Sequence, residues 1–167
     1  NKDCLVSYNW ETPYCCVIQI SDYNNHIIFL LVFCQVFHKL WTVWPHLIDP
    51  ALRDLPWGIV TNKPARFAHP LIQMLGLAQR VACVICGDET AYTKPHPEPL
   101  LIASSKIAIA PTNCIYLGDD IRDVQASLAA GMQPIVARYG YLGNEHPPET
   151  WGAKHLIDHP KELLAYL

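Results

Sequence analysis

Three aspartates stand close together in Gly118-Asp119-Asp120-Ile121-Arg122-Asp123. Carboxylates gathered this closely repel one another unless a cation lies between them, and Mg²⁺ typically takes one or two carboxylates together with a substrate phosphate. The apolar run Cys114–Leu117 predicts a buried strand before this loop, and a helical pattern follows from Val124 to Ala130. Open parallel sheets bind ligands at such strand ends. The alternative for one of the three aspartates is a structural cap, because Asp favours helix starts.

Two further polar clusters follow predicted strands. Thr61-Asn62-Lys63 ends one strand, and Lys94 lies in the loop after the next. Because the carboxyl ends of parallel strands meet at one edge of a sheet, all three clusters are expected there. Together they would supply a hydroxyl with loop amides, a cation and carboxylates, the parts that hold a phosphoryl group as its charge develops. Thr61 and Asn62 could instead cap the helix that follows, and Lys94 could be a solvated loop lysine.

The elements that must position these clusters alternate regularly from His46 onward. The predicted strands are Trp57–Thr61, Val81–Ile85, Cys114–Leu117, Gln133–Ala137 and His155–Ile157. The predicted helices are Leu47–Leu55, Pro64–Leu75, Glu98–Ala108, Val124–Ala130 and Pro160–Tyr166. This alternation predicts an α/β fold with right-handed crossovers, a Rossmann-like parallel sheet covered by helices on both faces.

Composition excludes some function classes. The chain has 167 residues, 51% of them apolar, which suits one domain with a real core. The net charge is −3 and the basic residues are scattered, which argues against a nucleic-acid surface. The apolar run Ile27–Phe37 is too short to span a bilayer unless it extends into polar residues, so it predicts a buried strand or helix rather than a membrane anchor. No standard signal peptide pattern opens the sequence.

The seven cysteines match no zinc signature. Cys83 and Cys86 form a CxxC pattern, but on a strand their side chains would point to opposite faces. We interpret them as buried small hydrophobes, with a redox pair or a metal site as the alternative. Reduced thiols would place the protein in the cytoplasm.

Three motifs in the chain resemble those of the haloacid dehalogenase superfamily. Thr61-Asn62-Lys63-Pro64, Lys94-Pro95-His96-Pro97-Glu98-Pro99 and Gly118 to Asp123 are similar to its second, third and fourth motifs. The likeness runs from about Leu55 to Leu167 and is strongest to the phosphoglycolate phosphatase branch. Within that branch, the N-acetylmuramate 6-phosphate phosphatases share further likenesses at Trp57 to Phe67, Arg138-Tyr139-Gly140-Tyr141, Trp151-Gly152-Ala153 and Asp158-His159-Pro160.

The resemblance implies a role for each motif residue. Thr61 and the amide of Asn62 would bind the substrate phosphate, and Lys94 would neutralise its charge. Asp119 would be a Mg²⁺ ligand, and Asp123 would support the metal site or orient Lys94. Asp120 matches a variable position of the family and carries less weight. The implied reaction is hydrolysis of a phosphomonoester through an aspartyl-phosphate.

The first family motif, Asp-x-Asp-Gly-Thr, is missing from this sequence. In the nearest fit, Asp22 would take the general acid position, but Ile20 would stand where the nucleophile belongs. The family's first strand lies in mid-sheet, so either Tyr14–Ile20 or Ile27–Phe33 is expected to fill its place, because an empty slot would expose strand edges. We predict an atypical segment at 1–45, with a replaced first strand and a truncated or absent cap domain, and a phosphatase core at 46–167.

Two functions follow as hypotheses. The first is a Mg²⁺-dependent phosphatase acting on a small phosphorylated metabolite, either 2-phosphoglycolate or a sugar phosphate such as N-acetylmuramate 6-phosphate, in a chain recorded without an evident nucleophile. The second is a catalytically inactive relative that binds phosphate or metal, or that serves as an interaction module. The sequence predicts no oligomeric state.

Overall fold

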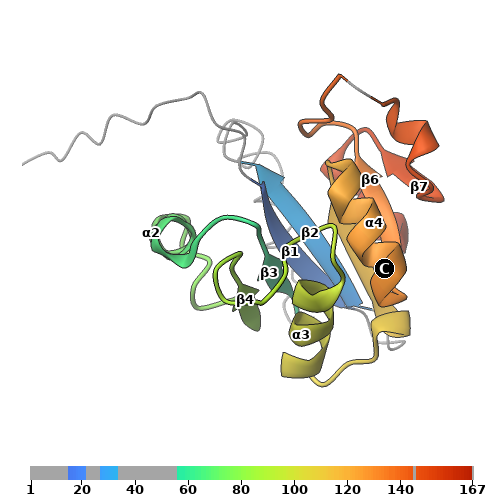
Figure 1. Ribbon diagram of the computed structural model, residues 1–167. Helices are drawn as coiled ribbons and strands as arrows, with labels where there is room; N and C mark the ends of the chain where they lie inside the picture. Colours follow the sequence, from blue (N-terminus) through green and yellow to red (C-terminus); the bar gives the residue numbers. More distant parts are fainter. Residues whose placement is uncertain (1–14, 22–26, 34–55, 145, 167) are drawn as a thin grey trace, which may run out of the picture.

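The computed structural model describes residues 15–21, 27–33, 56–144 and 146–166 (Figure 1). The predicted helix at Leu47–Leu55 and most of the predicted segment 1–45 lie outside these residues. Within them, strands alternate with helices from residue 58 onward, as the sequence predicts. No helix in these ranges combines the length and apolar character needed to span a membrane.

The described strands form two sheets. The larger has the order β1-β2-β5-β6-β7, and the smaller pairs β3 with β4. Their bounds are β1 Cys15–Ser21, β2 Ile27–Phe33, β3 Gly58–Val60, β4 Cys83–Ile85, β5 Cys114–Gly118, β6 Gln133–Ala137 and β7 His155–Ile157. All pairs are parallel except β1 with β2, which are antiparallel. The α/β fold with parallel sheets is therefore confirmed. The structure adds two features that the sequence did not predict, the antiparallel β1–β2 hairpin and the separate β3–β4 pair.

The strand β2 fills the place beside β5 that the sequence left open. Ile27 pairs with Cys114 and Leu30 with Leu117, in parallel. This agrees with the second of the two predicted candidates, Ile27–Phe33. β1 pairs along the other edge of β2 and also approaches β3. The apolar run that begins at Ile27 is thus a strand of the sheet for its first seven residues.

The carboxyl end of β1 lies at the edge of the sheet opposite the acidic loop. Ser21, the last residue of β1, pairs with Ile27, which pairs in turn with Cys114 at the amino end of β5. The acidic loop lies at the opposite end of β5, after Gly118. The alignment of Ile20 with the first motif is therefore wrong, because β1 ends at the other edge of the sheet. Asp22, the predicted general acid, lies outside the described residues.

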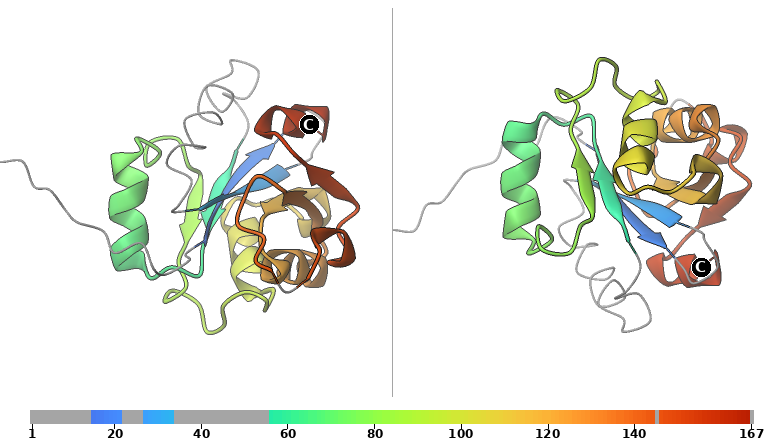
Figure 2. Two further views of the ribbon diagram at one scale, coloured as in Figure 1. Left: turned by 90° about the horizontal axis from the view of Figure 1, so that it is seen from above. Right: turned by 90° about the horizontal axis from the view of Figure 1, so that it is seen from below.

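Helices cover both faces of the sheet. Along β5, Ile115 and Leu117 pack in one core cluster with residues of α2 (Ala65–Met74), β3, β6 and the 3₁₀ helix η5 (Pro160–Tyr166). Cys114 and Tyr116 pack in a second cluster with residues of α3 (Glu98–Lys106) and α4 (Ile121–Ala130). Side chains alternate in this way because successive residues of a strand point to opposite faces. Figure 2 shows α2 beside β3 and β4, away from α3 and α4.

The helices begin and end close to their predicted bounds. α2 starts after Pro64, and α4 ends at Gly131, whose φ of 76° is the left-handed conformation that glycine adopts without strain. The last predicted helix is a 3₁₀ helix, η5. Two further 3₁₀ turns, η3 (Pro111–Asn113) and η4 (Pro148–Thr150), lie within segments that the sequence predicted as turn and loop.

Truncating a central core residue should destabilise the fold. Ile135 on β6 is 0% exposed, whereas Leu128 on α4 is 49% exposed. We expect Ile135→Ala to lower the free energy of unfolding by about 2–5 kcal/mol, because it removes buried methyl groups and leaves a cavity. Leu128→Ala, the control, should change it by less than about 0.5 kcal/mol. Urea unfolding of both variants measures this, and equal effects would contradict the assigned core.

Candidate active site

The ammonium of Lys94 is buried where three elements meet. The side chain is 1% exposed. Its Nζ lies 2.8 Å from Oδ1 of Asp123, 3.0 Å from the hydroxyl of Tyr116 and 3.3 Å from the carbonyl oxygen of Val60. These acceptors come from the first turn of α4, from β5 and from the end of β3. A buried cation needs such partners because it has lost its hydration, and the alternative of a solvated loop lysine is wrong.

Asn62 ties the loop after β3 to the backbone of Lys94. Its side-chain amide donates to the carbonyl of Lys94 at 3.0 Å, and its side-chain oxygen accepts from the Lys94 amide at 3.0 Å. The helix after Asn62 has a different cap: the amide of Ala65 donates to the carboxylate of Asp88 at 2.8 Å. Asn62 therefore positions Lys94 and does not cap α2.

In the chain, Thr61 lies between Val60 and Asn62, which both contact Lys94. It is 2% exposed, its amide donates to Ile85 of β4 at 2.9 Å, and its hydroxyl oxygen accepts from the amide of Lys63 at 3.0 Å. The hydroxyl is thus fixed at the end of β3 by its own loop. The structure therefore brings the Thr61-Asn62-Lys63 cluster and Lys94 together at one sheet edge.

Two of the three aspartates build the start of α4. Asp120 is the N-cap, and its carboxylate accepts from the Arg122 amide at 2.8 Å and pairs with the Arg122 guanidinium. Oδ2 of Asp123 accepts from the Asp120 amide at 3.1 Å, which completes a capping box. The alternative that one of the three aspartates is a helix cap is therefore confirmed for Asp120. Asp123 caps the helix with one oxygen and contacts Lys94 with the other.

Arg122 keeps Asp120 ionised. Burial raises the pKa of Asp120, but the hydrogen bonds and charge of Arg122, together with the charge of Lys94, outweigh that effect and lower the pKa below its ordinary value. The Lys94 ammonium is thus close enough to act on the Asp120 carboxylate electrostatically.

Asp119 is a buried carboxylate outside the helix cap. It is 2% exposed, and its Oδ2 accepts from the amide of Tyr141 at 2.8 Å. Gly140 makes this approach possible: a Cβ there would lie 2.2 Å from that of Asp119. Burial, and then the charges of Asp119 and Glu162, raise the pKa of the neighbouring Tyr139. The loop after β6 therefore holds Asp119 in place.

Tyr116 is a site residue that the sequence analysis missed. Its hydroxyl accepts from Lys94 at 3.0 Å and donates to Asp123 at 3.4 Å. The apolar run around it predicted only a buried strand, and nothing in its spacing distinguished it from a core aromatic. The sequence analysis also missed the Tyr141 amide that donates to Asp119, because every residue except proline has such an amide and none is marked in a sequence.

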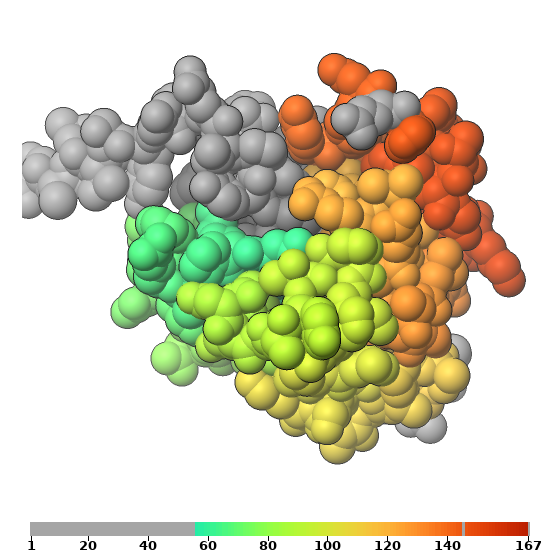
Figure 3. All heavy atoms as spheres, viewed as in Figure 1, coloured from blue at the N-terminus to red at the C-terminus, as the bar shows by residue number. Residues whose placement is uncertain are grey.

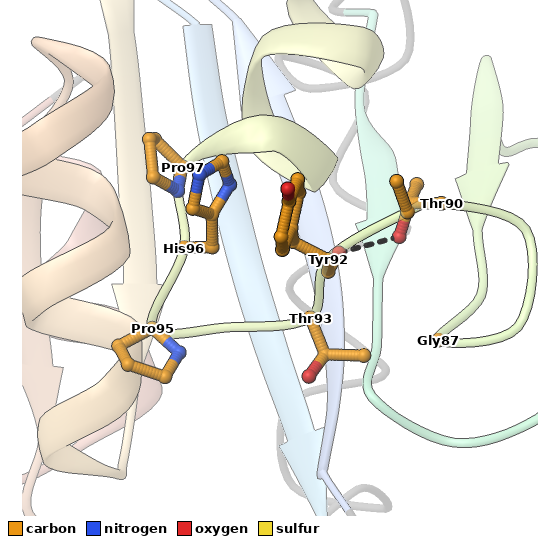
Figure 4. A pocket seen from close by; sticks show the side chains of 8 residues that line it. Gly87, Thr90, Tyr92, Thr93, Pro95, His96 and Pro97 are labelled. Carbon is orange, nitrogen blue, oxygen red and sulfur yellow. Dashed lines mark hydrogen bonds between the residues drawn. The ribbon is translucent and has the colours of Figure 1, made fainter.

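A shallow hollow lies beside this polar cluster, in the loop after β4. It measures about 600 Å³ and is lined by Gly87, Thr90, Ala91, Tyr92, Thr93, Pro95, His96 and Pro97 (Figure 4). The rings of Tyr92 and His96 stack with centroids 4.3 Å apart. The loop lies on the face that also carries α3 and α4 (Figure 3). The side chain of Lys94 belongs to the buried cluster and not to the wall of this hollow.

Comparison with known proteins identifies the family. The family model for haloacid dehalogenase-like hydrolases matches residues 48–137, which hold all three polar clusters. The chain belongs to the haloacid dehalogenase-like hydrolases. The family resemblance inferred from the motifs is thereby confirmed.

Within this family, the similar curated proteins are phosphatases. The chain is 46% identical over 135 residues to the N-acetylmuramic acid 6-phosphate phosphatase of Pseudomonas aeruginosa, covering 80% of this chain and 60% of that protein. It is 50% identical over 107 residues to the phosphoglycolate phosphatase of Xylella fastidiosa, covering 64% of this chain and 47% of that protein. The chain thus spans about half to three-fifths of the curated relatives that it matches.

Solved structures confirm the fold. A haloacid dehalogenase-superfamily hydrolase of subfamily IA from Geobacter sulfurreducens superposes with a TM-score of 0.57 at 20% identity, over 82% of this chain and 57% of that one. At this identity the likeness speaks for the fold alone.

Breaking the buried ion pair should cost more than breaking a surface pair. Lys94→Met and Asp123→Asn should each lower the free energy of unfolding by about 3–5 kcal/mol, because each leaves a buried charge uncompensated. The double variant should lose less than the sum. The control is Arg138→Met, which removes an exposed pair with Glu149 and should cost about 0–1 kcal/mol. Urea unfolding of all four variants tests this, and additive single effects would contradict the pairing.

Asp120 should stabilise the fold only while it is ionised. Its pKa is lower in the folded state than in the unfolded chain, so its charge contributes at neutral pH and the contribution is lost as pH falls through the folded pKa. We expect Asp120→Ala to lower the free energy of unfolding by about 0.5–2 kcal/mol at pH 7 through loss of the cap. The difference from wild type should shrink in acid. Denaturation at a series of pH values measures it, and a gap that widened in acid would refute the assignment.

Proposed function

We propose that this chain carries the core of a phosphatase that hydrolyses small phosphorylated metabolites. The observation that supports the proposal most directly is the buried Lys94 ammonium, held by Asp123, Tyr116 and the carbonyl of Val60, the residue that precedes Thr61. A fixed cation and hydroxyl in a buried place suit a phosphate ester, because charge develops on its oxygens during transfer and preorganised donors stabilise it.

Each proposed site residue has a distinct part. Thr61 and the amide of Asn62 bind phosphate oxygens, and Lys94 neutralises their charge. Asp123 orients Lys94, since its Oδ1 is the nearest acceptor of the ammonium. Tyr116 completes the support from β5. These three acceptors fix the direction of the Lys94 ammonium before substrate binds. The phosphate oxygens would then compete with them for the Nζ hydrogens.

Asp119 fits the requirements of a Mg²⁺ ligand. It offers hard carboxylate oxygens, its residue is buried, and the Tyr141 amide fixes its orientation. We propose that Asp119 holds Mg²⁺, which when bound would neutralise phosphate charge and favour attack at phosphorus. Asp120, engaged with Arg122, is not part of this set.

The attacking carboxylate is the part that the described residues do not supply. An aspartyl-phosphate route needs an Asp at the carboxyl end of the strand beside β5. β2 occupies that position, and its residues Ile27–Phe33 include no carboxylate. This chain matches 60% and 59% of the length of two curated relatives, and we propose that the nucleophile of the whole enzyme lies outside the residues that the structure describes.

The candidate substrates are the two that the relatives' names state. These are N-acetylmuramic acid 6-phosphate for the Pseudomonas aeruginosa protein and phosphoglycolate for the Xylella fastidiosa protein. Both are small phosphomonoesters, and the cluster around Lys94 would treat the phosphate alike in each. We place the reaction in the cytoplasm, because the buried Cys83, Cys86 and Cys114 carry reduced thiols.

The second candidate function is phosphate binding without turnover. The absence of Asp-x-Asp-Gly-Thr from the sequence favours it. Such a module would keep the anion site of Thr61, Asn62 and Lys94 and lack the attacking group. It would still bind phosphate and Mg²⁺.

Turnover and binding assays separate the two functions. The chain is incubated with Mg²⁺ and each of the two phosphomonoesters, and phosphate release is measured. In parallel, inorganic phosphate binding is measured by calorimetry with Mg²⁺ present. We expect Asp119→Asn to reduce turnover at least 100-fold, or to weaken phosphate binding at least tenfold if no turnover occurs, because it removes the carboxylate charge that holds the cation. Asp120→Asn, the control, should change either value less than threefold.

Each outcome decides between the proposals. Turnover lost in Asp119→Asn supports the enzyme. Binding without turnover supports the module, and an Asp-x-Asp-Gly-Thr in another reading frame of the upstream DNA would then explain the missing nucleophile. If wild type neither binds phosphate nor releases it, both proposals fail.

A further inference from the structure

Three metal-ligating side chains gather outside the site described above. They are His69 on α2, Cys86 directly after β4, and Glu89 in the loop that follows. One imidazole nitrogen, the sulfur and one carboxylate oxygen all lie within 4.8 Å of one another. None of these residues belongs to the cluster around Lys94 and Asp119.

Contacts with Cys86 and His69 fix the position of the Glu89 side chain. Its Oε2 accepts from the amide of Cys86 at 2.7 Å, and its Oε1 lies 3.8 Å from Nε2 of His69. One oxygen thus anchors the side chain while the other faces the imidazole. The side chains of His69 and Glu89 are 55% and 40% exposed, whereas Cys86 is 0% exposed. The sulfur therefore forms the floor of the group, and the other two donors form its solvent-facing wall.

The donor set selects the kind of cation. Imidazole nitrogen, thiolate sulfur and carboxylate oxygen are the ligands of Zn²⁺, while Mg²⁺ prefers oxygen alone. With metal–ligand bonds of about 2.0–2.3 Å, tetrahedral ligand atoms lie about 3.5 Å apart. Rotation of the exposed His69 side chain can bring its nitrogen closer to the other two donors. Three protein ligands leave a fourth position for water, on the solvent side.

The CxxC pattern itself does not supply this site. Cys83 and Cys86 pack in different core clusters, on opposite faces of the sheet. The Cys83 thiol lies 3.9 Å from the carbonyl of Ala103, and burial raises its pKa to about 11 despite the charge of Lys106. Cys86 instead meets partners from α2 and from its own loop. The prediction that the two cysteines are buried and point to opposite faces is therefore confirmed.

We propose that His69, Cys86 and Glu89 form a Zn²⁺ site that joins α2 to the loop after β4. Gly87, the next residue, donates its amide to the carbonyl of Lys63 at 3.0 Å, and a Cβ at Gly87 would come 2.2 Å from the carbonyl oxygen of Asn62. Asn62 in turn holds the backbone of Lys94. A metal ion at Cys86 would thus fix the segment on which the phosphate-binding loop rests.

Metal titration of the full chain tests the proposal. Zn²⁺ binding is measured by calorimetry in excess Mg²⁺, and Co²⁺ is used as a spectroscopic probe, because thiolate ligation produces a near-ultraviolet charge-transfer band. We expect one Zn²⁺ site whose affinity falls at least tenfold in His69→Gln and in Glu89→Gln. Both positions are exposed, so these variants should fold. The Co²⁺ thiolate band should vanish in Cys86→Ser and persist in Cys83→Ser, the matched control, whose buried cysteine lies three residues earlier at the start of β4.

Asp119→Asn should leave the Zn²⁺ affinity unchanged, so this site can fail or succeed independently of the phosphatase proposal. Absence of Zn²⁺ binding in wild type would overturn the inference. So would equal affinities in wild type, His69→Gln and Glu89→Gln, since the ion would then be bound elsewhere in the chain. Loss of the Co²⁺ band in Cys83→Ser with retention in Cys86→Ser would overturn the choice of sulfur.

Discussion

The structure around the site depends on one constraint, the burial of the Lys94 ammonium. A cation removed from water must find its hydrogen-bond acceptors in the protein, and removing its carboxylate partner leaves a costly unpaired charge. Here the acceptors come from β3, from β5 and from the first turn of α4. The three crossover units are thus fixed relative to one another by one charged group, and this is the group that we propose binds the phosphate.

The acidic loop divides its carboxylates between helix capping and the polar cluster around Lys94. Asp120 serves the helix, since it caps α4 and pairs with Arg122. Asp123 serves both, because one oxygen closes the capping box and the other meets Lys94. Asp119 takes no part in the helix cap, and the Tyr141 amide orients it across the sheet edge. Local helix capping therefore sets the direction of Asp123, and that direction makes the ion pair possible.

The direction of β1, as well as its pairing with β2, decides which residues of the amino-terminal part can reach the acidic loop. β2 lies beside β5 in the place where the family has its first strand, and the hairpin with β1 removes an exposed edge. However, the hairpin also turns the end of β1 away from the acidic loop. The described fold is thus that of the family, with Thr61, Asn62 and Lys94 brought together at one sheet edge, while a strand ending in the nucleophile is not among its described parts.

The sequence by itself determined the alternation of strands and helices, the three polar clusters and the edge at which they meet. Strand alternation, helix periodicity and capping are local properties, so Ile115, Tyr116 and Asp120 could be placed from their neighbours in the chain. Only the tertiary structure decided that Asp88 caps α2, that the Tyr116 hydroxyl bridges Lys94 and Asp123, and that Cys86 faces His69 and Glu89 rather than Cys83. These contacts join distant segments through side-chain direction and backbone amides, which no spacing in a single sequence encodes.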